Sequence, residues 1–275
     1  KKKNLEIFSK ETRDSNIKVL TDKISKIIFL EKIKTNNRYY RFKKKMVYGD
    51  KVKVFTKDKT IVTKRTKEDL SRFNNFKKFI VNKDICDFGC GNGSFLKIVS
   101  DHCKFSCGVE LYEEYLSLNT KKFKIYPNIT STQKKFDTIF LFHVLEHLTN
   151  PIEELKNLKK FLKKNGTIII EVPHGNDFLL RNCDKFKKFS LWSEHLILHT
   201  EISLIKFLKK AGFKNVKINY FQRYNYLNHL HWINNGKPNG NLILKKDFNK
   251  MIDINYKLFL KKAKMTDTLY CEAKI

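Results

Sequence analysis

The chain has 275 residues, of which 41% are hydrophobic and 13% aromatic, and its formal net charge is +29. This length can bury a full core, and the composition excludes a disordered chain. The charge is compatible with nucleic-acid binding, but the lysines are spread along the whole chain, and arginine, which forms forked contacts with phosphate, is scarce. We therefore expect a solvated basic surface that favours small anionic substrates, and we do not expect nucleic acid as the partner.

Membrane insertion and metal binding are not expected either. No apolar run approaches the ~18 residues of a membrane span, and no signal peptide is visible. Two cysteine pairs have four-residue spacings, Cys86/Cys90 and Cys103/Cys107. Because Cys86 and Cys107 fall in apolar segments, we interpret them as small buried residues and expect no metal site. These features predict a reduced, cytoplasmic protein.

The first 75 residues are predicted to form a separate N-terminal segment. Two short apolar runs, residues 17–20 and 27–30, favour a hairpin of strands. Aromatic patches follow at residues 39–40 and 46–48. Apolar residues then recur every three positions, which indicates an amphipathic helix leading into the first core strand. Its apolar positions are Leu70, Phe73, Phe76 and Phe79.

From residue 76 to 275, strands and helices alternate in a second domain. Strands are predicted at about 83–88, 105–110, 123–126, 136–142, 167–172, 216–221 and 268–275, and helices at 93–101, 112–118, 151–165 and 201–211. This order requires a mostly parallel sheet with helices on both faces. An insertion at about residues 225–266 precedes the last strand and is too long for a hairpin loop.

Two of these segments show periodic apolar positions that predict buried helix faces. The helix after Thr200 is expected to bury Ile202, Leu204, Ile205, Leu208 and Ala211. The insertion has a helical pattern at Phe248, Ile252, Tyr256 and Leu260.

A glycine-rich turn between the first core strand and its helix is the most informative motif. Gly89, Gly91 and Gly93 follow an apolar strand that ends with Asp87, and Glu110 follows the next strand. Glycines let the backbone approach a ligand closely, and a strand-end acid can accept hydrogen bonds from ribose hydroxyls. The spacing differs from the pattern of dinucleotide enzymes. It resembles the S-adenosylmethionine site of class I methyltransferases.

Further motifs strengthen this resemblance over residues 80–275. The run FDTIFLFHVLEH at residues 136–147, the segment 166–174, the pair Glu194-His195 and the stretch 222–229 are similar to methyltransferases of sugar and surface-polysaccharide biosynthesis. The resemblance implies an α/β, Rossmann-like, doubly wound sheet of seven strands whose last strand is antiparallel. It also implies S-adenosyl-L-methionine as cofactor and O- or C-methylation of a nucleotide-linked sugar, with the N-terminal segment and the insertion capping the substrate.

The same resemblance assigns roles to residues of this chain. The expected cofactor-binding residues are Asp87, Gly89, Gly91, Gly93, Glu110, Leu111, Phe142 and His143. His195 is the favoured catalytic base beside Glu194, with His174 and His143 as competitors. Arg223, Tyr224, Asn228 and His229 are expected to bind substrate, because an arginine with aromatic and amide groups suits a phosphorylated sugar.

Alternative interpretations remain open at this point. Glu110 could be a solvated strand-end acid, His143 a hydrogen-bonded core residue, and the residues after 222 packing for the insertion. Glu146 and His147 are expected to orient the following helix. An RNA or DNA methyltransferase is the alternative that the charge favours, although such enzymes usually have an aromatic–proline motif where this chain has His143-Val-Leu. A non-catalytic cofactor-binding domain is the third reading.

Overall fold

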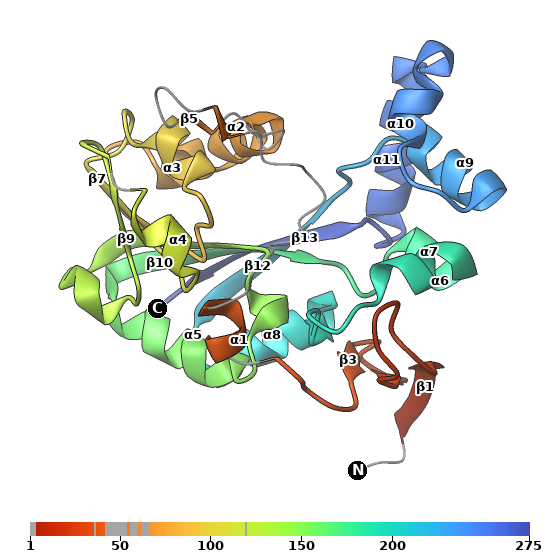
Figure 1. Ribbon diagram of the computed structural model, residues 1–275, viewed down its shortest axis with the longest axis horizontal. Coiled ribbons are helices and arrows are strands. Elements are labelled where there is room, and N and C mark those ends of the chain that lie inside the picture. The colour runs from red at the N-terminus through yellow and green to blue at the C-terminus, as the bar shows by residue number, and fades with distance from the viewer. Residues whose placement is uncertain (1–3, 36, 42–53, 56–59, 62–65, 119) are drawn as a thin grey trace. The chain divides into compact units, whose positions relative to one another are not determined.

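The computed structural model describes residues 4–35, 37–41, 54–55, 60–61, 66–118 and 120–275 (Figure 1). The predicted patch at residues 46–48 lies outside these ranges. The chain divides into two compact units. Unit 1 contains residues 1–34, 143–152 and 170–272, and unit 2 contains residues 35–142, 153–169 and 273–275.

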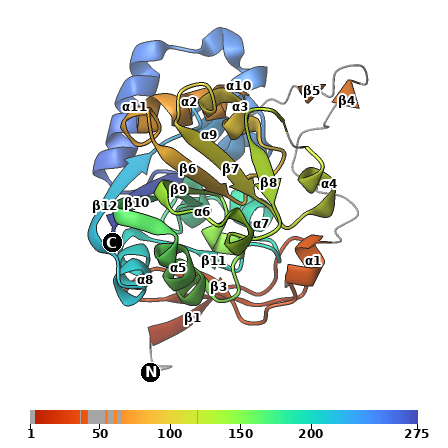
Figure 2. The same ribbon diagram turned by 90° about the vertical axis from the view of Figure 1, so that its left-hand side faces the viewer.

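The main sheet has seven strands in the order β12-β13-β10-β9-β6-β7-β8. It is mostly parallel, with antiparallel pairing at its C-terminal strands, which confirms the predicted fold class. Strand β6 pairs in parallel with both β7 and β9, and β7 pairs in parallel with β8 (Figure 2). The strands are β6 Asp84–Phe88, β7 Phe105–Val109, β8 Lys124–Tyr126, β9 Phe136–Phe142, β10 Leu162–Pro173, β12 Lys214–Phe221 and β13 Thr268–Lys274. Continuous apolar runs such as β9 suit strands that are covered on both faces.

Strand β10 begins earlier than predicted, because helix α5 (Pro151–Lys160) is shorter than the predicted helix. The Lys163 ammonium group lies 2.5 Å from a carboxylate oxygen of Asp84 and 2.8 Å from one of Asp137. These ion pairs fix residue 163 beside the N-terminal ends of β6 and β9, so the chain is already extended before Gly166.

The helices of unit 2 that surround the glycine turn are α2 (Thr66–Phe76), α3 (Ser94–Val99) and α4 (Glu113–Leu116). Helix α2 confirms the predicted amphipathic helix, and its predicted face is right at Phe76, which is buried, but wrong at Leu70. Leu70 is 45% exposed, whereas Asp69 and Arg72 are buried. Nη1 of Arg72 forms an ion pair of 2.8 Å with Oδ1 of Asp69, and the Arg72 guanidinium lies 4.6 Å from the centre of the Phe142 ring.

Unit 1 contains a small antiparallel sheet with the order β1-β2-β3-β11. Its strands are β1 Leu5–Ser9, β2 Val19–Asp22, β3 Ile28–Leu30 and β11 Ile197–Leu198. The antiparallel pairing of β2 with β3 confirms the predicted hairpin. Strands β1 and β11 were not predicted, because β1 is mostly exposed, and β11 is only two residues long and pairs with the distant β3. A core of buried aliphatic side chains joins them: Ile17, Val19, Ile28, Leu30, Leu180, Leu191, Leu196 and Leu198.

The other helices of unit 1 are α6 Phe178–Asn182, α7 Asp184–Ser190, α8 Glu201–Lys210, α9 Tyr226–Asn235, α10 Gly240–Ile243 and α11 Lys250–Lys262. The insertion is therefore helical, and Figure 1 shows α9, α10 and α11 packed together. Helix α8 begins with the expected Thr200 cap.

Two predicted helix faces were wrong in part. Ile202 is 43% exposed and Ile252 is 52% exposed. Helix α11 buries Leu260 as predicted, but it also buries Asp253, because the Asp253 carboxylate accepts a hydrogen bond from the backbone N–H of Tyr226 in α9. Among the described residues, no helix combines the length and apolarity that crossing a membrane demands.

Candidate active site

The glycine turn of unit 2 has a backbone that only glycine adopts easily. Gly89, Gly91 and Gly93 have φ angles of 77°, 54° and 71°. The N–H groups of Gly89 and Cys90 both donate to the carbonyl oxygen of Val109, at 2.7 and 3.1 Å. A Cβ on Gly93 would lie 2.9 Å from Cε2 of Phe123. The turn is therefore pinned to the carboxyl end of β7, and a side chain at Gly93 would collide with Phe123.

The Glu110 carboxylate accepts hydrogen bonds from this turn and from the residues that follow β7. Its Oε2 accepts the N–H of Gly91 at 2.9 Å, and its Oε1 accepts those of Leu111 and Tyr112 at 2.7 and 3.0 Å. A carboxylate oxygen has two lone pairs, so Oε2 retains capacity for another donor. Glu110 is thus not merely a solvated strand-end acid, because it connects the turn to the residues after β7.

The remaining expected cofactor residues of unit 2 are at the same strand ends. Asp87 is 3% exposed and lies in β6, and Phe142 ends β9 with its ring 4.9 Å from that of Phe95. S-adenosylmethionine would need a glycine-rich turn, a carboxylate that can accept further hydrogen bonds, and an aromatic side chain beside them. The residues of this unit therefore fit that cofactor.

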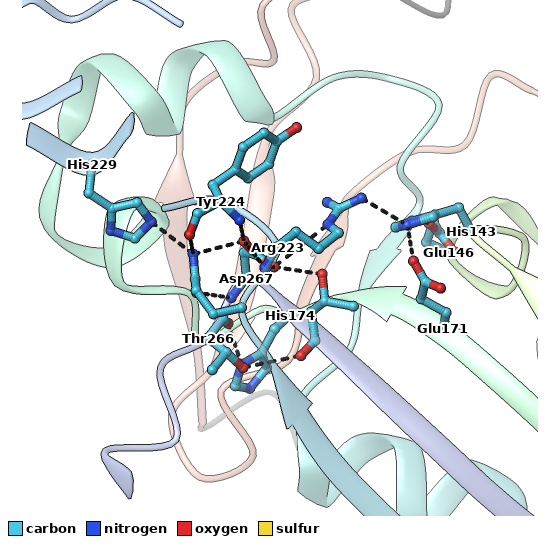
Figure 3. Close-up of polar contacts among 11 residues, drawn as sticks. His143, Glu146, Glu171, His174, Arg223, Tyr224, His229, Thr266 and Asp267 are labelled. Atoms are coloured by element: carbon cyan, nitrogen blue, oxygen red, sulfur yellow. Dashed lines mark hydrogen bonds and ion pairs between the residues drawn. The ribbon is translucent and has the colours of Figure 1, made fainter. Parts of the chain in front are cut away.

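In unit 1, His143 directly follows Phe142 in the chain and is held between two buried carboxylates (Figure 3). Its Nδ1 lies 3.1 Å from Oε1 of Glu146, and its Nε2 lies 2.9 Å from Oε1 of Glu171. Its φ of 57° is left-handed, which is strained for a residue with a Cβ. Burial disfavours the charged imidazole, but the hydrogen bonds with Glu146 and Glu171 raise the pKa of His143 above its ordinary value.

Arg223 follows β12 and also reaches His143. Its Nη1 lies 3.1 Å from Nε2 of His143, on the nitrogen that Glu171 contacts. When His143 is protonated, Nε2 donates to Glu171 and faces the cationic guanidinium. When it is neutral, Nε2 can accept from Arg223. The protonation of His143 therefore decides whether its Nε2 contacts Glu171 as a donor or Arg223 as an acceptor.

Asp267, just before β13, anchors the segment that carries Arg223. Its carboxylate accepts the backbone N–H groups of Arg223 and Tyr224 at 3.0 and 3.2 Å, and the side-chain amide of Gln222 at 2.8 Å. The Arg223 Nε lies 3.6 Å from the same carboxylate. Tyr224 is 44% exposed, so its ring is accessible beside Arg223.

The other expected substrate residues are more deeply buried. His229 is 2% exposed, and its ring contacts the Tyr256 hydroxyl at 2.8 Å and the Gln222 amide at 3.1 Å. Burial lowers the pKa of His229 to about 4. Asn228 is 4% exposed, and its N–H is capped by the Asn225 side chain.

The expected catalytic histidines lie in different surroundings within unit 1. His174 is 3% exposed, its Nδ1 contacts the Thr266 carbonyl at 2.9 Å, and burial lowers its pKa to about 4. Burial and neighbouring His147 lower the pKa of His195 to about 3, so its imidazole is neutral at pH 7 but weakly basic. The backbone carbonyl of Glu194 accepts from Nδ1 of His147 at 2.8 Å.

Sequence reasoning missed two members of this cluster and assigned a third differently. Glu171 interrupts the otherwise apolar strand TIIIEV at residues 167–172. An acid at the end of a buried strand could have indicated a functional residue. Asp267 gave no signal, because its partners are brought to it by the insertion. Glu146 was expected to orient a helix, yet its carboxylate is fully buried against His143.

Comparisons with known proteins place these features in a family. A family described as "Methyltransferase domain" matches residues 62–218. The chain is similar to the tRNA U34 carboxymethyltransferase of Haemophilus ducreyi, with 27% identity over 152 residues that cover 50% of this chain and 47% of that protein. The enzyme of the same name from Glaesserella parasuis is 31% identical over 150 residues, covering 48% and 46%.

The chain spans about half the length of the curated relatives that it matches. Among solved structures, a SAM dependent methyltransferase from Archaeoglobus fulgidus has a TM-score of 0.53 and 19% identity, covering 76% of this chain and 94% of that one. That likeness supports the fold.

Proposed function

The chain belongs to the methyltransferase domain family, and from this premise we propose that it transfers a methyl group from S-adenosylmethionine to an RNA. Bound S-adenosylmethionine supplies a methyl group that a positively charged sulfur already activates. The protein must therefore bind the donor, orient the acceptor and take up the acceptor's proton.

One observation carries the donor half of this proposal. The three left-handed glycines form a turn that the Glu110 carboxylate clamps through the N–H of Gly91. This arrangement builds the turn largely from residues without side chains and keeps a carboxylate oxygen beside it as acceptor for ribose hydroxyls. Asp87, Leu111 and Phe142 complete the proposed donor site of unit 2.

The acceptor half is proposed to involve the cluster of unit 1. The His143 side chain is 26% exposed and is oriented by two buried carboxylates. It can take a proton from an acceptor hydroxyl or amine and share it with Glu171. Arg223 supplies a cation and Tyr224 an exposed ring. In single-stranded RNA, cations of this kind contact phosphates and aromatic rings stack on bases.

Two facts favour RNA as the acceptor class. The curated relatives are named for tRNA, and the net charge of +29 supplies the field that a polyanion needs. Both weigh against the expectation that nucleic acid is not the partner. The proposal takes only the acceptor class from these relatives, because the match covers half of their length.

A nucleotide-linked sugar is the second candidate acceptor. The position of Arg223 beside Tyr224 favours this candidate. A guanidinium can bind a diphosphate through two hydrogen bonds, and the ring can stack on the attached base. The resemblance noted in the sequence to sugar methyltransferases points the same way, whereas the relatives found do not.

The test is a transfer assay with a methyl donor that carries an isotopic label. Purified protein is incubated with total tRNA, with the same tRNA digested to nucleosides, and with a panel of nucleotide sugars, and products are analysed by mass spectrometry. We expect label in intact tRNA. Label in a sugar alone would replace RNA by the second candidate, and donor binding without transfer to any acceptor would favour a non-catalytic domain.

A further inference from the structure

We propose that Glu146, His147 and His195 of unit 1 bind one divalent transition-metal ion. Among the residues that the structure describes, these three form a group whose ligand atoms lie within 4.8 Å of one another. Two imidazoles and one carboxylate are a common ligand set for Zn²⁺, Co²⁺, Mn²⁺ and Fe²⁺. The expectation of no metal site came from the cysteine pairs, which are not part of this group.

The Glu146 carboxylate supplies the strongest indication of a missing cation. Its side chain is 0% exposed, and Oε1 is used by His143. Its Oε2 is buried and has no hydrogen-bond partner among the described residues. A buried anionic oxygen without a partner is costly, and a metal ion would satisfy it.

The two histidines of this group lie close together, and the hydrogen bond of His147 sets which ring nitrogen carries its proton. His147 contacts the Glu194 carbonyl through Nδ1, so Nδ1 carries the proton and Nε2 carries the lone pair. Metal-binding histidines commonly donate their second nitrogen to a carbonyl in this way. The ring of His195 lies 5.0 Å from that of His147, so both imidazoles are close enough to share one ion.

The backbone holds these ligands together independently of any ion. Glu146 and His147 belong to the short 3-10 helix Leu145–His147, against which β11 packs. The N–H of Leu196 donates to the Glu146 carbonyl at 2.8 Å, which fixes the segment of His195 beside that helix. His143 in turn orients the carboxylate through Oε1 (Figure 3). The site is therefore built before the ion arrives.

Three protein ligands leave further coordination positions for water or a substrate oxygen, as in catalytic rather than structural sites. If the proposed methyl transfer holds, an ion at this position would polarise an acceptor hydroxyl and favour loss of its proton. This role rests on the proposed function, whereas ion binding does not.

The test of ion binding uses full-length, metal-free protein titrated with Co²⁺ and, in competition with a coloured chelator, with Zn²⁺. We expect one ion per chain and a Co²⁺ spectrum without thiolate bands. Glu146→Gln and His195→Gln should each weaken binding by more than about a hundredfold, since loss of an outer partner alone costs about 10–100-fold. His102→Asn and Glu153→Gln, which change an exposed histidine and carboxylate outside the group, should bind as the wild type does.

Circular dichroism of each metal-free variant shows whether it is folded. If Glu146→Gln does not fold, His195→Gln alone tests the site. Absence of binding in the wild type, a thiolate spectrum, or unchanged affinity in folded Glu146→Gln and His195→Gln would overturn the site. Because binding is read without donor or acceptor, it can stand even if the methyl-transfer assay fails. Full transfer activity after complete metal removal would overturn only the catalytic role.

Discussion

At the scale of single residues, Glu110 holds the glycine turn and is proposed to bind the donor, and Glu110→Ala removes the carboxylate that does both. Its carboxylate holds the N–H of Gly91 and is proposed to accept ribose hydroxyls. Glu110→Ala should weaken S-adenosylmethionine binding by about 10–100-fold, because a charged hydrogen bond is worth ~1.5–3 kcal/mol. Isothermal titration calorimetry measures this, with Glu113→Gln on the exposed face of α4 as the control. Unchanged donor affinity in Glu110→Ala would remove the ribose assignment.

Asp177, the N-cap of α6, gives unit 1 a pH dependence of stability. Burial, and then the charge of Asp267, raise the pKa of Asp177 to about 7. Between the ordinary pKa of ~3.9 and that value, the folded protein holds a proton that the unfolded chain has released. Its stabilising contribution is therefore complete below the ordinary value and is lost as pH rises to about 7, with a slope of up to ~1.4 kcal/mol per pH unit.

Asp177→Asn removes this titration and keeps an oxygen for the N–H of Leu179. We expect the free energy of unfolding of the variant to fall less steeply than that of the wild type between about pH 4 and pH 7. Urea unfolding at several pH values in that window measures both slopes. Parallel curves would mean that Asp177 is ionised in the folded protein throughout.

The residues that sequence could identify are those whose partners are near in the chain. The glycines and Glu110 act through a turn and the strand beside it, so their spacing predicts their geometry. Asp267 meets Arg223 only because the forty residues of the insertion return the chain to β12, and no local pattern encodes that return.

At the scale of elements, the glycine turn and β7 are packed too closely to accept another atom. A Cβ on Gly108 would overlap Sγ of Cys90 and lie 3.0 Å from Cδ1 of Leu96. Gly108→Ala should therefore lower the free energy of unfolding by roughly 1–3 kcal/mol, the usual cost of overpacking. Thermal unfolding measures the loss.

The double variant Gly108→Ala/Cys90→Ala is the matched control, because it removes the nearest overlapping atom. It should recover part of the stability lost in Gly108→Ala, relative to Cys90→Ala alone. Strict additivity of the two substitutions would show that the Cys90 sulfur is not the source of the destabilisation.

Element positions were predictable where caps and apolar runs agree, and helix faces were not always so. The Thr200 cap fixed the start of α8, yet Ile202 is exposed because Ser203 and Leu204 occupy the buried face. In α11, the hydrogen bond between Asp253 and Tyr226 rotates a polar residue inward. A hydrophobic pattern does not register such polar contacts between helices.

At the scale of the whole molecule, the mostly parallel sheet followed from the alternation of strands and helices. The acceptor class did not, because a charge of +29 distributed along the chain fits a solvated surface as well as a nucleic-acid site. The distinction is energetic: a polyanion releases counterions when lysines contact its phosphates, whereas a nucleotide sugar carries few charges.

RNA binding should therefore weaken steeply with salt. For single strands, log affinity against log salt concentration falls with a slope of about −0.7 per phosphate contacted, so contact with several phosphates gives a slope of about −3 or steeper. Fluorescence anisotropy with labelled tRNA over a salt series measures it, and S-adenosylmethionine affinity in the same buffers should change much less. A slope shallower than about −1 would correspond to fewer than two phosphates, would contradict RNA as the acceptor, and would leave the nucleotide-linked sugar as the better candidate.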